Sequence, residues 1–172
     1  MPDLCNKVVL DLACGTGRYG LQATQAGAQW VIGVDNSAEM LASNPQTQLA
    51  LATTEAIPLP ANAVDVILCG LALGHLPQLT PSLSEISRIL KPGGLALISD
   101  FHPIAVFNGG QRTFKTSGGA VFAVEHHAHL YSDYHQAAHT THLHIVNVVE
   151  TGTEAMKSPA PVVIVYVLEK AN

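Results

Sequence analysis

The amino-acid sequence predicts a single α/β domain whose core is a mostly parallel sheet. Short apolar runs of strand length alternate with helical segments along most of the 172 residues, a pattern typical of strands joined by right-handed helical crossovers. A glycine-rich turn directly follows the first run, as it does where a parallel strand leads into a helix. The sequence has no repeats and no low-complexity linker, which indicates one domain over residues 1–172.

Glycine, proline and cap residues bound the predicted elements. The first helix starts at Arg18 and ends at Gly27, and Ser37 caps a short second helix. A third helix opens at Thr80-Pro81 and ends at the Lys91-Pro92-Gly93-Gly94 turn. The five apolar runs predicted as parallel strands are 8–12, 30–34, 48–52, 64–69 and 95–99.

The last third of the chain has a different pattern. A helix is predicted over 132–141, followed by strands at 145–149 and 162–168. Only about a dozen Pro-rich residues separate these strands, too few for a helical crossover, so an antiparallel pair is predicted. The connection 104–130 is longer than a simple loop and contains β-rich flanks around Ser117-Gly118-Gly119, which predict a hairpin over Thr113 to Glu125.

Composition excludes several classes of function. Hydrophobic residues make up 48% of the chain and charged residues 12%, and the net charge of −5 with a pI near 5.9 disfavours a nucleic-acid partner. The longest purely apolar run is far shorter than a membrane span. Three scattered cysteines form no metal or disulfide pattern, so a reducing, cytoplasmic location is expected.

The glycine-rich turn has two interpretations. Gly15 and Gly20 bound a formal G-x-G-x-x-G, and Asp35 lies 20 residues beyond Gly15, as in a dinucleotide-binding enzyme. However, Asp11 in the preceding strand would repel a pyrophosphate at protein-like dielectric. The same carboxylate suits S-adenosylmethionine, which has no phosphate and carries an ammonium and a sulfonium. Asp35 suits both ligands, because ribose hydroxyls occur in each, so Asp11 favours S-adenosylmethionine.

Four stretches together resemble the class I S-adenosylmethionine-dependent methyltransferases, in particular the small-molecule type of ubiquinone, menaquinone and biotin pathways. In chain order they are "VLDLACGTGRYG", "VIGVDNSAEML", "ATTEAIPLPANAVDVILCGLALGHL" and "EISRILKPGGLALISDFHP". The resemblance implies a Rossmann-like three-layer sandwich, with a seven-stranded sheet whose last strand is antiparallel. It also implies S-adenosylmethionine as cofactor, S-adenosylhomocysteine as product, and O-, N- or C-methylation of a small molecule.

By position, the resemblance assigns a cofactor role to residues that follow strands one, two and four. The methionine end, the ribose and the adenine are expected against them, while Thr53 stands where the family often has an acidic residue that contacts adenine. The predicted cofactor residues are Asp11, Ala13, Gly15, Gly17, Asp35, Asn36, Met40, Thr54, Glu55, Cys69 and Leu71.

Candidate catalytic and substrate residues come from the same sheet edge and from the long insertion. His75 and His102 each follow a parallel strand, and a histidine there can act as substrate ligand or base, or be structural. The family's N-terminal lid helices have no counterpart before the first strand, so either the chain is trimmed there or another segment supplies the lid. The insertion at about 103–130 is expected to act as the lid, with a plain surface loop as the alternative. The candidate substrate residues are Tyr19, Arg112, His127 and His129.

Other interpretations stay open. His135 and His139 have metal-ligand spacing but lack a convincing third ligand, so no metal is expected. A homodimer is a candidate assembly. The chain could also be a cofactor-binding but non-catalytic subunit, or, against Asp11, an NAD(P)-dependent oxidoreductase.

Overall fold

The core of the computed structural model is one sheet of seven strands in the order β3-β2-β1-β4-β5-β9-β8. The structure describes residues 2–110, 113–116, 118–151 and 160–172, and the number of strands refers to these residues. Strands β3, β2, β1, β4 and β5 are mutually parallel, while β9 runs antiparallel to both neighbours. The predicted seven-stranded, mostly parallel sheet is therefore confirmed. Its strands are β1 (Val8–Leu12), β2 (Trp30–Asp35), β3 (Leu49–Leu51), β4 (Val64–Gly70), β5 (Leu90–Phe101), β8 (Leu143–Thr151) and β9 (Val163–Lys170).

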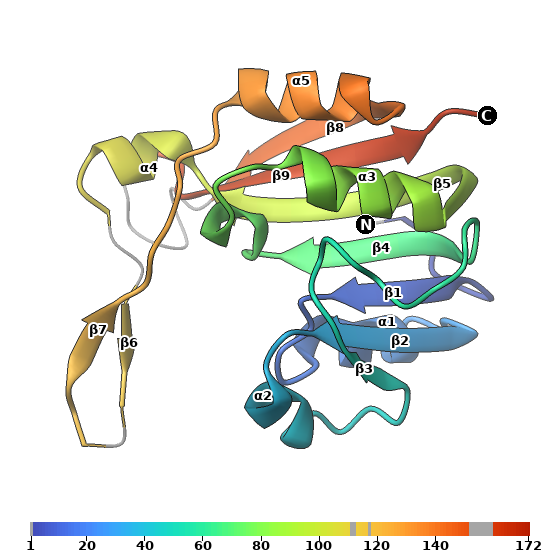
Figure 1. The fold of residues 1–172 in the computed structure, drawn as a ribbon, viewed down its shortest axis with the longest axis horizontal. Coiled ribbons are helices and arrows are strands. Elements are labelled where there is room, and N and C mark those ends of the chain that lie inside the picture. Colours follow the sequence, from blue (N-terminus) through green and yellow to red (C-terminus); the bar gives the residue numbers. More distant parts are fainter. Residues whose placement is uncertain (1, 111–112, 117, 152–159) are drawn as a thin grey trace.

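Helices cover both faces of the sheet (Figure 1). Helices α3 (Thr80–Ile89) and α5 (Tyr131–Thr140) lie on one face, over β4, β5, β8 and β9, and α1 (Arg18–Gln25) lies on the other, against β1 and β2. Short helices follow three strands at their carboxyl ends. They are α2 (Ala38–Ala42), the 3-10 helix η1 (Leu73–His75) and α4 (Pro103–Phe107).

Alternation along the strands divides the core into two parts. In β1, Leu10 and Leu12 belong to the large core between the sheet and helices α3 and α5, whereas Val9 belongs to a smaller cluster with Ala23 of α1. Both clusters are fully buried at these positions. Residue period two thus gives β1, in the centre of the sheet, two buried faces, as is typical of strands in parallel sheets.

Strand β5 and helix α4 differ most from the sequence prediction. Strand β5 begins at Leu90 instead of Leu95, because Leu90 already pairs with Val64 of β4. The register then shifts before the Val66–Leu95 pair, and this shift accommodates the predicted Pro92-Gly93-Gly94 turn within the strand. Helix α4 was not predicted. The ring of His102 accepts a hydrogen bond from the Ile104 N–H and Pro103 occupies the first turn, which starts a helix inside the predicted loop.

The predicted hairpin is present in the long insertion. Strands β6 (Thr113–Lys115) and β7 (Val121–Ala123) pair in antiparallel register. Figure 1 shows this hairpin projecting from the body of the molecule, on the side toward which β1 and β4 point. The insertion then returns through residues 124–130 to the start of α5.

Candidate active site

A cavity of about 460 Å³ opens at the carboxyl ends of β1, β2 and β4. This is the edge of an open α/β sheet where ligands bind. Two of its non-glycine residues, Ala13 and Leu71, have left-handed backbones (φ 56° and 55°) directly after β1 and β4, a strained conformation that clusters at ligand sites. The cavity is lined by Ala13, Gly15, Asp35, Asn36, Ser37, Met40, Thr53, Thr54, Glu55, Gly70, Leu71, Ala72, His75 and Leu76.

Asp35, the last residue of β2, lines this cavity. Its Oδ2 accepts the Gly15 N–H at 2.7 Å, and its Oδ1 accepts the Ser37 N–H at 2.8 Å. A carboxylate has about four acceptor positions, so both oxygens keep capacity for ligand hydroxyls.

The glycines of the turn serve different purposes. A Cβ at Gly15 would meet nothing within 4 Å, so the space against this residue is open to a ligand. A Cβ at Gly17 would collide with Asn44, and one at Gly20 with Gln46. The predicted cofactor residue Gly17 does not line the cavity. Its role in the structure is to let the 44–46 segment pack against the turn, where Asn44 Nδ2 donates to the Gly15 carbonyl at 3.0 Å.

Asp11 lies beneath the turn and does not line the cavity. Its side chain is fully buried, and its Oδ2 accepts the Gly20 N–H in the first turn of α1 at 2.7 Å. Burial raises the pKa of Asp11 to about 6; the Gly20 N–H and the Gln46 side chain oppose this, and the charge of Asp35 adds to it. The carboxylate therefore complements the positive end of the α1 dipole and places negative potential behind the turn.

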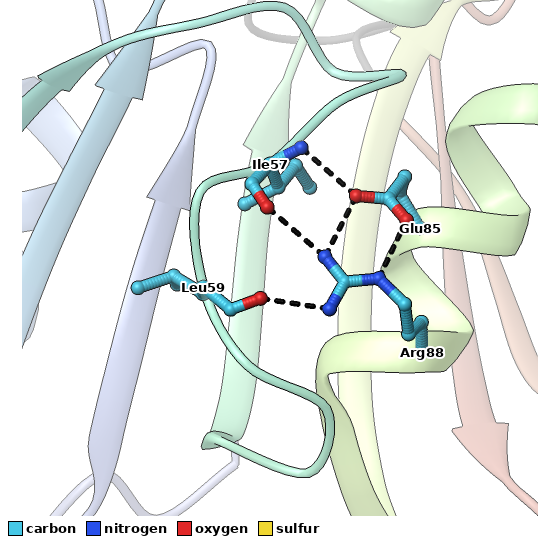
Figure 2. Close-up of polar contacts among 4 residues, drawn as sticks. All are labelled: Ile57, Leu59, Glu85 and Arg88. Atoms are coloured by element: carbon cyan, nitrogen blue, oxygen red, sulfur yellow. Dashed lines mark hydrogen bonds and ion pairs between the residues drawn. The ribbon is translucent and has the colours of Figure 1, made fainter.

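A clamp on α3 fixes the loop that carries the predicted adenine-side residues. Figure 2 shows Arg88 donating to the main-chain carbonyls of Ile57 (3.0 Å) and Leu59 (2.7 Å). Glu85 pairs with the same guanidinium through both oxygens, at 2.6 and 2.8 Å, and accepts the Ile57 N–H at 2.9 Å. Because this loop continues directly from Thr53 to Glu55, the clamp positions that wall of the cavity.

A second, apolar groove of about 160 Å³ adjoins the cavity at Gly70, which lines both. The predicted substrate residue Tyr19 and the predicted cofactor residue Cys69 line this groove and not the larger cavity. Burial, with the charges of Asp100 and Asp11, raises the pKa of the Cys69 thiol, so it is not a nucleophile at neutral pH. The remaining lining residues are Leu68, Leu97, Ser99 and Val165.

The two candidate catalytic histidines have different surroundings. His75 lines the cavity, and its Nδ1 lies 2.8 Å from the Glu125 carbonyl oxygen. The ring of His102 is buried; Nδ1 accepts the Ile104 N–H at 3.1 Å and Nε2 lies 3.1 Å from Glu150 Oε1. His102 does not line the cavity. Nδ1 thus caps α4, and Nε2 is left to donate a hydrogen bond to Glu150, so the structure favours the structural alternative for His102.

The insertion reaches the site through its last residues. His127 donates its main-chain N–H to the Gly74 carbonyl at 2.7 Å, and His129 Nε2 lies 2.9 Å from the Leu76 carbonyl oxygen. Neither side chain lines the cavity. Arg112, the fourth predicted substrate residue, lies outside the described residues. None of the described residues of 103–123 lines the cavity or the groove.

Several lining residues were not singled out from the sequence. Ser37, Thr53, Gly70, Ala72 and Leu76 all line the cavity. Each follows a strand or flanks a predicted site residue, so the rule that ligands bind beyond carboxyl strand ends could have found them. Nothing local in the sequence indicates the packing of the 44–46 segment against the glycine turn, because that contact joins residues about 30 apart.

Neither a metal-binding cluster nor a membrane-spanning helix is present in the part of the chain that the structure describes. No three His, Cys, Asp or Glu side chains gather there in a way that could hold a metal ion. No helix in that part has the length and apolar character needed to cross a membrane.

Comparison with known proteins agrees with this geometry. The family model described as "Methyltransferase domain" matches residues 10–98, more than half of the chain. The malonyl-[acyl-carrier protein] O-methyltransferase of Yersinia pestis is 40% identical over 96 residues, covering 54% of this chain and 36% of that protein. The 2-phytyl-1,4-naphtoquinone methyltransferase of Nostoc punctiforme is 37% identical over 105 residues, covering 54% and 46%. The chain thus spans less than half the length of these relatives.

A solved structure matches the whole fold. The S-adenosylmethionine-dependent methyltransferase from Mesorhizobium loti superposes with a TM-score of 0.81 at 20% identity, over 99% of this chain and 94% of that one. The strand order, the cavity at the carboxyl edge and the family model agree with one another. The chain belongs to the class I S-adenosylmethionine-dependent methyltransferases, and its cofactor is S-adenosylmethionine.

Proposed function

We propose that this protein transfers a methyl group from S-adenosylmethionine to an oxygen, nitrogen or carbon of a small molecule. The observation that carries the proposal is the junction at Gly70, where the cavity with Asp35 meets the apolar groove. A cofactor in the cavity and a substrate in the groove would be adjacent there. The names of the relatives, one acting on an acyl-carrier substrate and one on a naphthoquinone, support a substrate with an apolar part.

Different residues would then bind different parts of S-adenosylmethionine. Asp35 would accept hydrogen bonds from the ribose hydroxyls. Gly15 and Ala13 would border the methionine end, and Met40, Thr54 and Glu55 the adenine. Asp11 would act through the negative potential behind the turn, which suits a cationic ligand and disfavours a pyrophosphate.

Positioning would supply most of the rate. S-adenosylmethionine supplies a methyl group on a sulfonium sulfur, which leaves with the electron pair of the carbon–sulfur bond. Tyr19 would hold the substrate in the groove, and His75 would take the proton that the accepting atom loses. The insertion would exclude water as a lid.

The expected location and oligomeric state belong to the same proposal. The cysteines Cys5, Cys14 and Cys69 are all free thiols, which supports a reducing cytosol as the location. A homodimer remains a prediction that sedimentation of the purified protein would test.

The decisive experiment for this function is a transfer assay. The protein is incubated with S-adenosylmethionine carrying a labelled methyl group and a small-metabolite extract, and products are identified by mass spectrometry. A labelled metabolite that forms with the parent protein and not with Asp35→Ala supports the proposal. Cofactor binding without any labelled product would instead favour a non-catalytic cofactor-binding subunit.

A further inference from the structure

A short segment at the end of the insertion, residues 125–129, forms hydrogen bonds with residues 74–76 beside the cavity. We name it the His segment. The His75 Nδ1 bonds to the Glu125 carbonyl (2.8 Å), the His127 N–H donates to the Gly74 carbonyl (2.7 Å), and the His129 Nε2 bonds to the Leu76 carbonyl (2.9 Å). Residues 74–76 are therefore held, one by one, by a segment about 50 positions later in the chain.

The contact to Glu125 determines where the proton of His75 lies. A carbonyl oxygen can only accept a hydrogen bond, so His75 Nδ1 must carry the N–H. Neutral imidazole has a single N–H, and its other nitrogen then carries the basic lone pair. Nε2 of His75 is therefore the basic nitrogen of this cavity-lining residue. Free histidine prefers the opposite tautomer, so the protein selects this one.

His126 and Asp100 anchor the His segment. The His126 side chain is 8% exposed, and its Nε2 lies 3.9 Å from Oδ1 of Asp100, a 3% exposed side chain at the end of β5. The His126 ring meets the rings of His75 and Phe101 edge to face, with centroids 6.0 and 5.7 Å apart. It also lies so close to Gly74 that a Cβ there would collide with it.

Asp100 is itself held in place. Its Oδ2 accepts the Tyr134 hydroxyl of α5 at 3.0 Å, and its Oδ1 accepts the Phe101 N–H at 2.8 Å. Burial raises the pKa of Asp100, while these two donors and the charges of His126 and His129 oppose the rise. The carboxyl group is thus fixed between α5 and the His segment.

We propose that Asp100 and His126 are positioning residues for methyl transfer, which hold the His segment so that Glu125 fixes His75 with a basic Nε2. The inference rests on the proposed function, in which His75 accepts the proton of the substrate. Asp100 and His126 line neither the cavity nor the groove, so they act through His75 and not on the substrate.

The tautomer of His75 can be measured without a known substrate. The full chain is labelled with ¹⁵N-histidine, and ring nitrogens are observed by NMR above the usual titration range of histidine, with His75→Gln to assign the signal. In the parent protein we expect a protonated Nδ1 and an unprotonated Nε2. A parent spectrum with the proton on Nε2 would overturn the inference by itself.

Variants then test the anchor. Gly74→Ala changes no titratable group but leaves no room for the His126 ring, and Asp100→Asn removes the charge opposite it. In both, we expect the Nε2–H form of His75 to rise from a minor to the major population. His127→Gln is the matched control, because it keeps the main-chain N–H to Gly74, and it should leave the tautomer of His75 as in the parent. An unchanged tautomer in Gly74→Ala and Asp100→Asn would contradict the positioning role.

This result is separable from the proposed function. If the parent shows the expected tautomer but transfers no methyl group, the function fails while the structural basis of this inference stands. If the parent transfers methyl groups and His75 carries its proton on Nε2, the inference fails alone. Circular dichroism identifies a variant that does not fold, and in that case the parent spectrum decides.

Discussion

The Oδ2 atom of Asp35 accepts a hydrogen bond from the main-chain N–H of Gly15 at 2.7 Å. This bond joins the ends of β1 and β2, which are neighbours in the sheet but 20 residues apart in sequence. It gives Asp35 two roles, since the same carboxylate shapes the glycine turn and faces the cavity. Its side chain is largely buried, with the whole residue only 9% exposed.

Replacing Asp35 should therefore affect binding and stability together. In Asp35→Ala, we expect the affinity for S-adenosylhomocysteine to fall about tenfold or more, because a charged acceptor of hydrogen bonds contributes roughly 1.5–3 kcal/mol. The unfolding free energy should also fall, by about 1–3 kcal/mol, because the N–H groups of Gly15 and Ser37 lose their acceptor. Calorimetry and urea unfolding measure the two effects.

Glu39→Ala is the matched control for this prediction. Glu39 is an exposed acidic residue on α2, next to Met40 but outside the cavity lining. Glu39→Ala removes the same charge as Asp35→Ala but no residue of the cavity lining. It should therefore leave the affinity for S-adenosylhomocysteine and the unfolding free energy near the parent values. Equal losses of affinity in Asp35→Ala and Glu39→Ala would indicate a general charge effect and not ribose hydrogen bonds.

Asp11 should make stability depend on pH. Its pKa is raised in the folded protein to about 6 from an ordinary value of 3.8, so the folded state holds its proton more tightly than the unfolded state does. The ionised group consequently opposes folding, and stability falls as pH rises toward and through 6. From about pH 5 to about pH 8 this group should cost on the order of 1–2 kcal/mol.

Asp11→Asn removes this titration but keeps an oxygen that can accept the Gly20 N–H. Urea unfolding at the two pH values should show the variant gaining on the parent as pH rises. A constant difference in unfolding free energy between variant and parent would mean that the Asp11 pKa is not raised by burial.

The Arg88 clamp should matter for both the loop and the cofactor. Arg88→Lys keeps the positive charge but cannot reach Ile57, Leu59 and both Glu85 oxygens at once, because an ammonium lacks the guanidinium fork. We expect the unfolding free energy to fall by about 1–3 kcal/mol and the affinity for S-adenosylhomocysteine to fall several-fold.

Lys91→Gln provides the comparison for this clamp. Lys91 pairs with Asp65 at 2.9 Å across two partly exposed side chains, away from the cavity lining, and such surface pairs contribute at most about 1 kcal/mol. Its loss should leave cofactor affinity unchanged. If Arg88→Lys affects affinity no more than Lys91→Gln does, the clamp does not position the cavity wall.

The projecting hairpin should be needed for catalysis and not for cofactor binding. Val121 and Phe122 are 55% and 50% exposed, and Phe107 in the preceding helix is 70% exposed, so closure over the site would bury apolar surface. Replacing 113–123 with a short Gly/Ser linker leaves the His segment intact. It should keep affinity for S-adenosylhomocysteine within a few-fold and abolish methyl transfer. Transfer at the parent rate would show that the hairpin is not a lid.

Much of the fold follows from local sequence signals, because strand and helix periodicity, glycine stops and proline starts act within a few residues. The same signals located the cavity, since Ala13, Asp35, Thr54, Leu71 and His75 all lie at or beyond the carboxyl ends of parallel strands. They could not separate a ligand-edge histidine from a helix cap. His102 precedes Pro103 and caps α4, and only the His-Pro pair hinted at that.

Long-range contacts account for most of what the sequence did not predict. Gly17 was assigned to the cofactor by position, but the side chain of Asn44 occupies the space beside it. Asp100 is the last residue but one of β5 and interrupts an apolar run. An acidic residue near a carboxyl strand end was a usable signal for a site. Its link to His126 and Tyr134 depends on how α5 and the insertion return to the sheet.

The cavity should bind S-adenosylmethionine and not a dinucleotide, because the Asp11 carboxylate lies beneath the glycine turn, where it would repel a pyrophosphate. Isothermal calorimetry of the parent protein with S-adenosylhomocysteine and, separately, with NADH measures this preference. We predict saturable binding of S-adenosylhomocysteine and none of NADH; a hundredfold excess of the first over its Kd should also stabilise the fold by about 2.7 kcal/mol. Saturable binding of NADH without binding of S-adenosylhomocysteine would contradict this assignment.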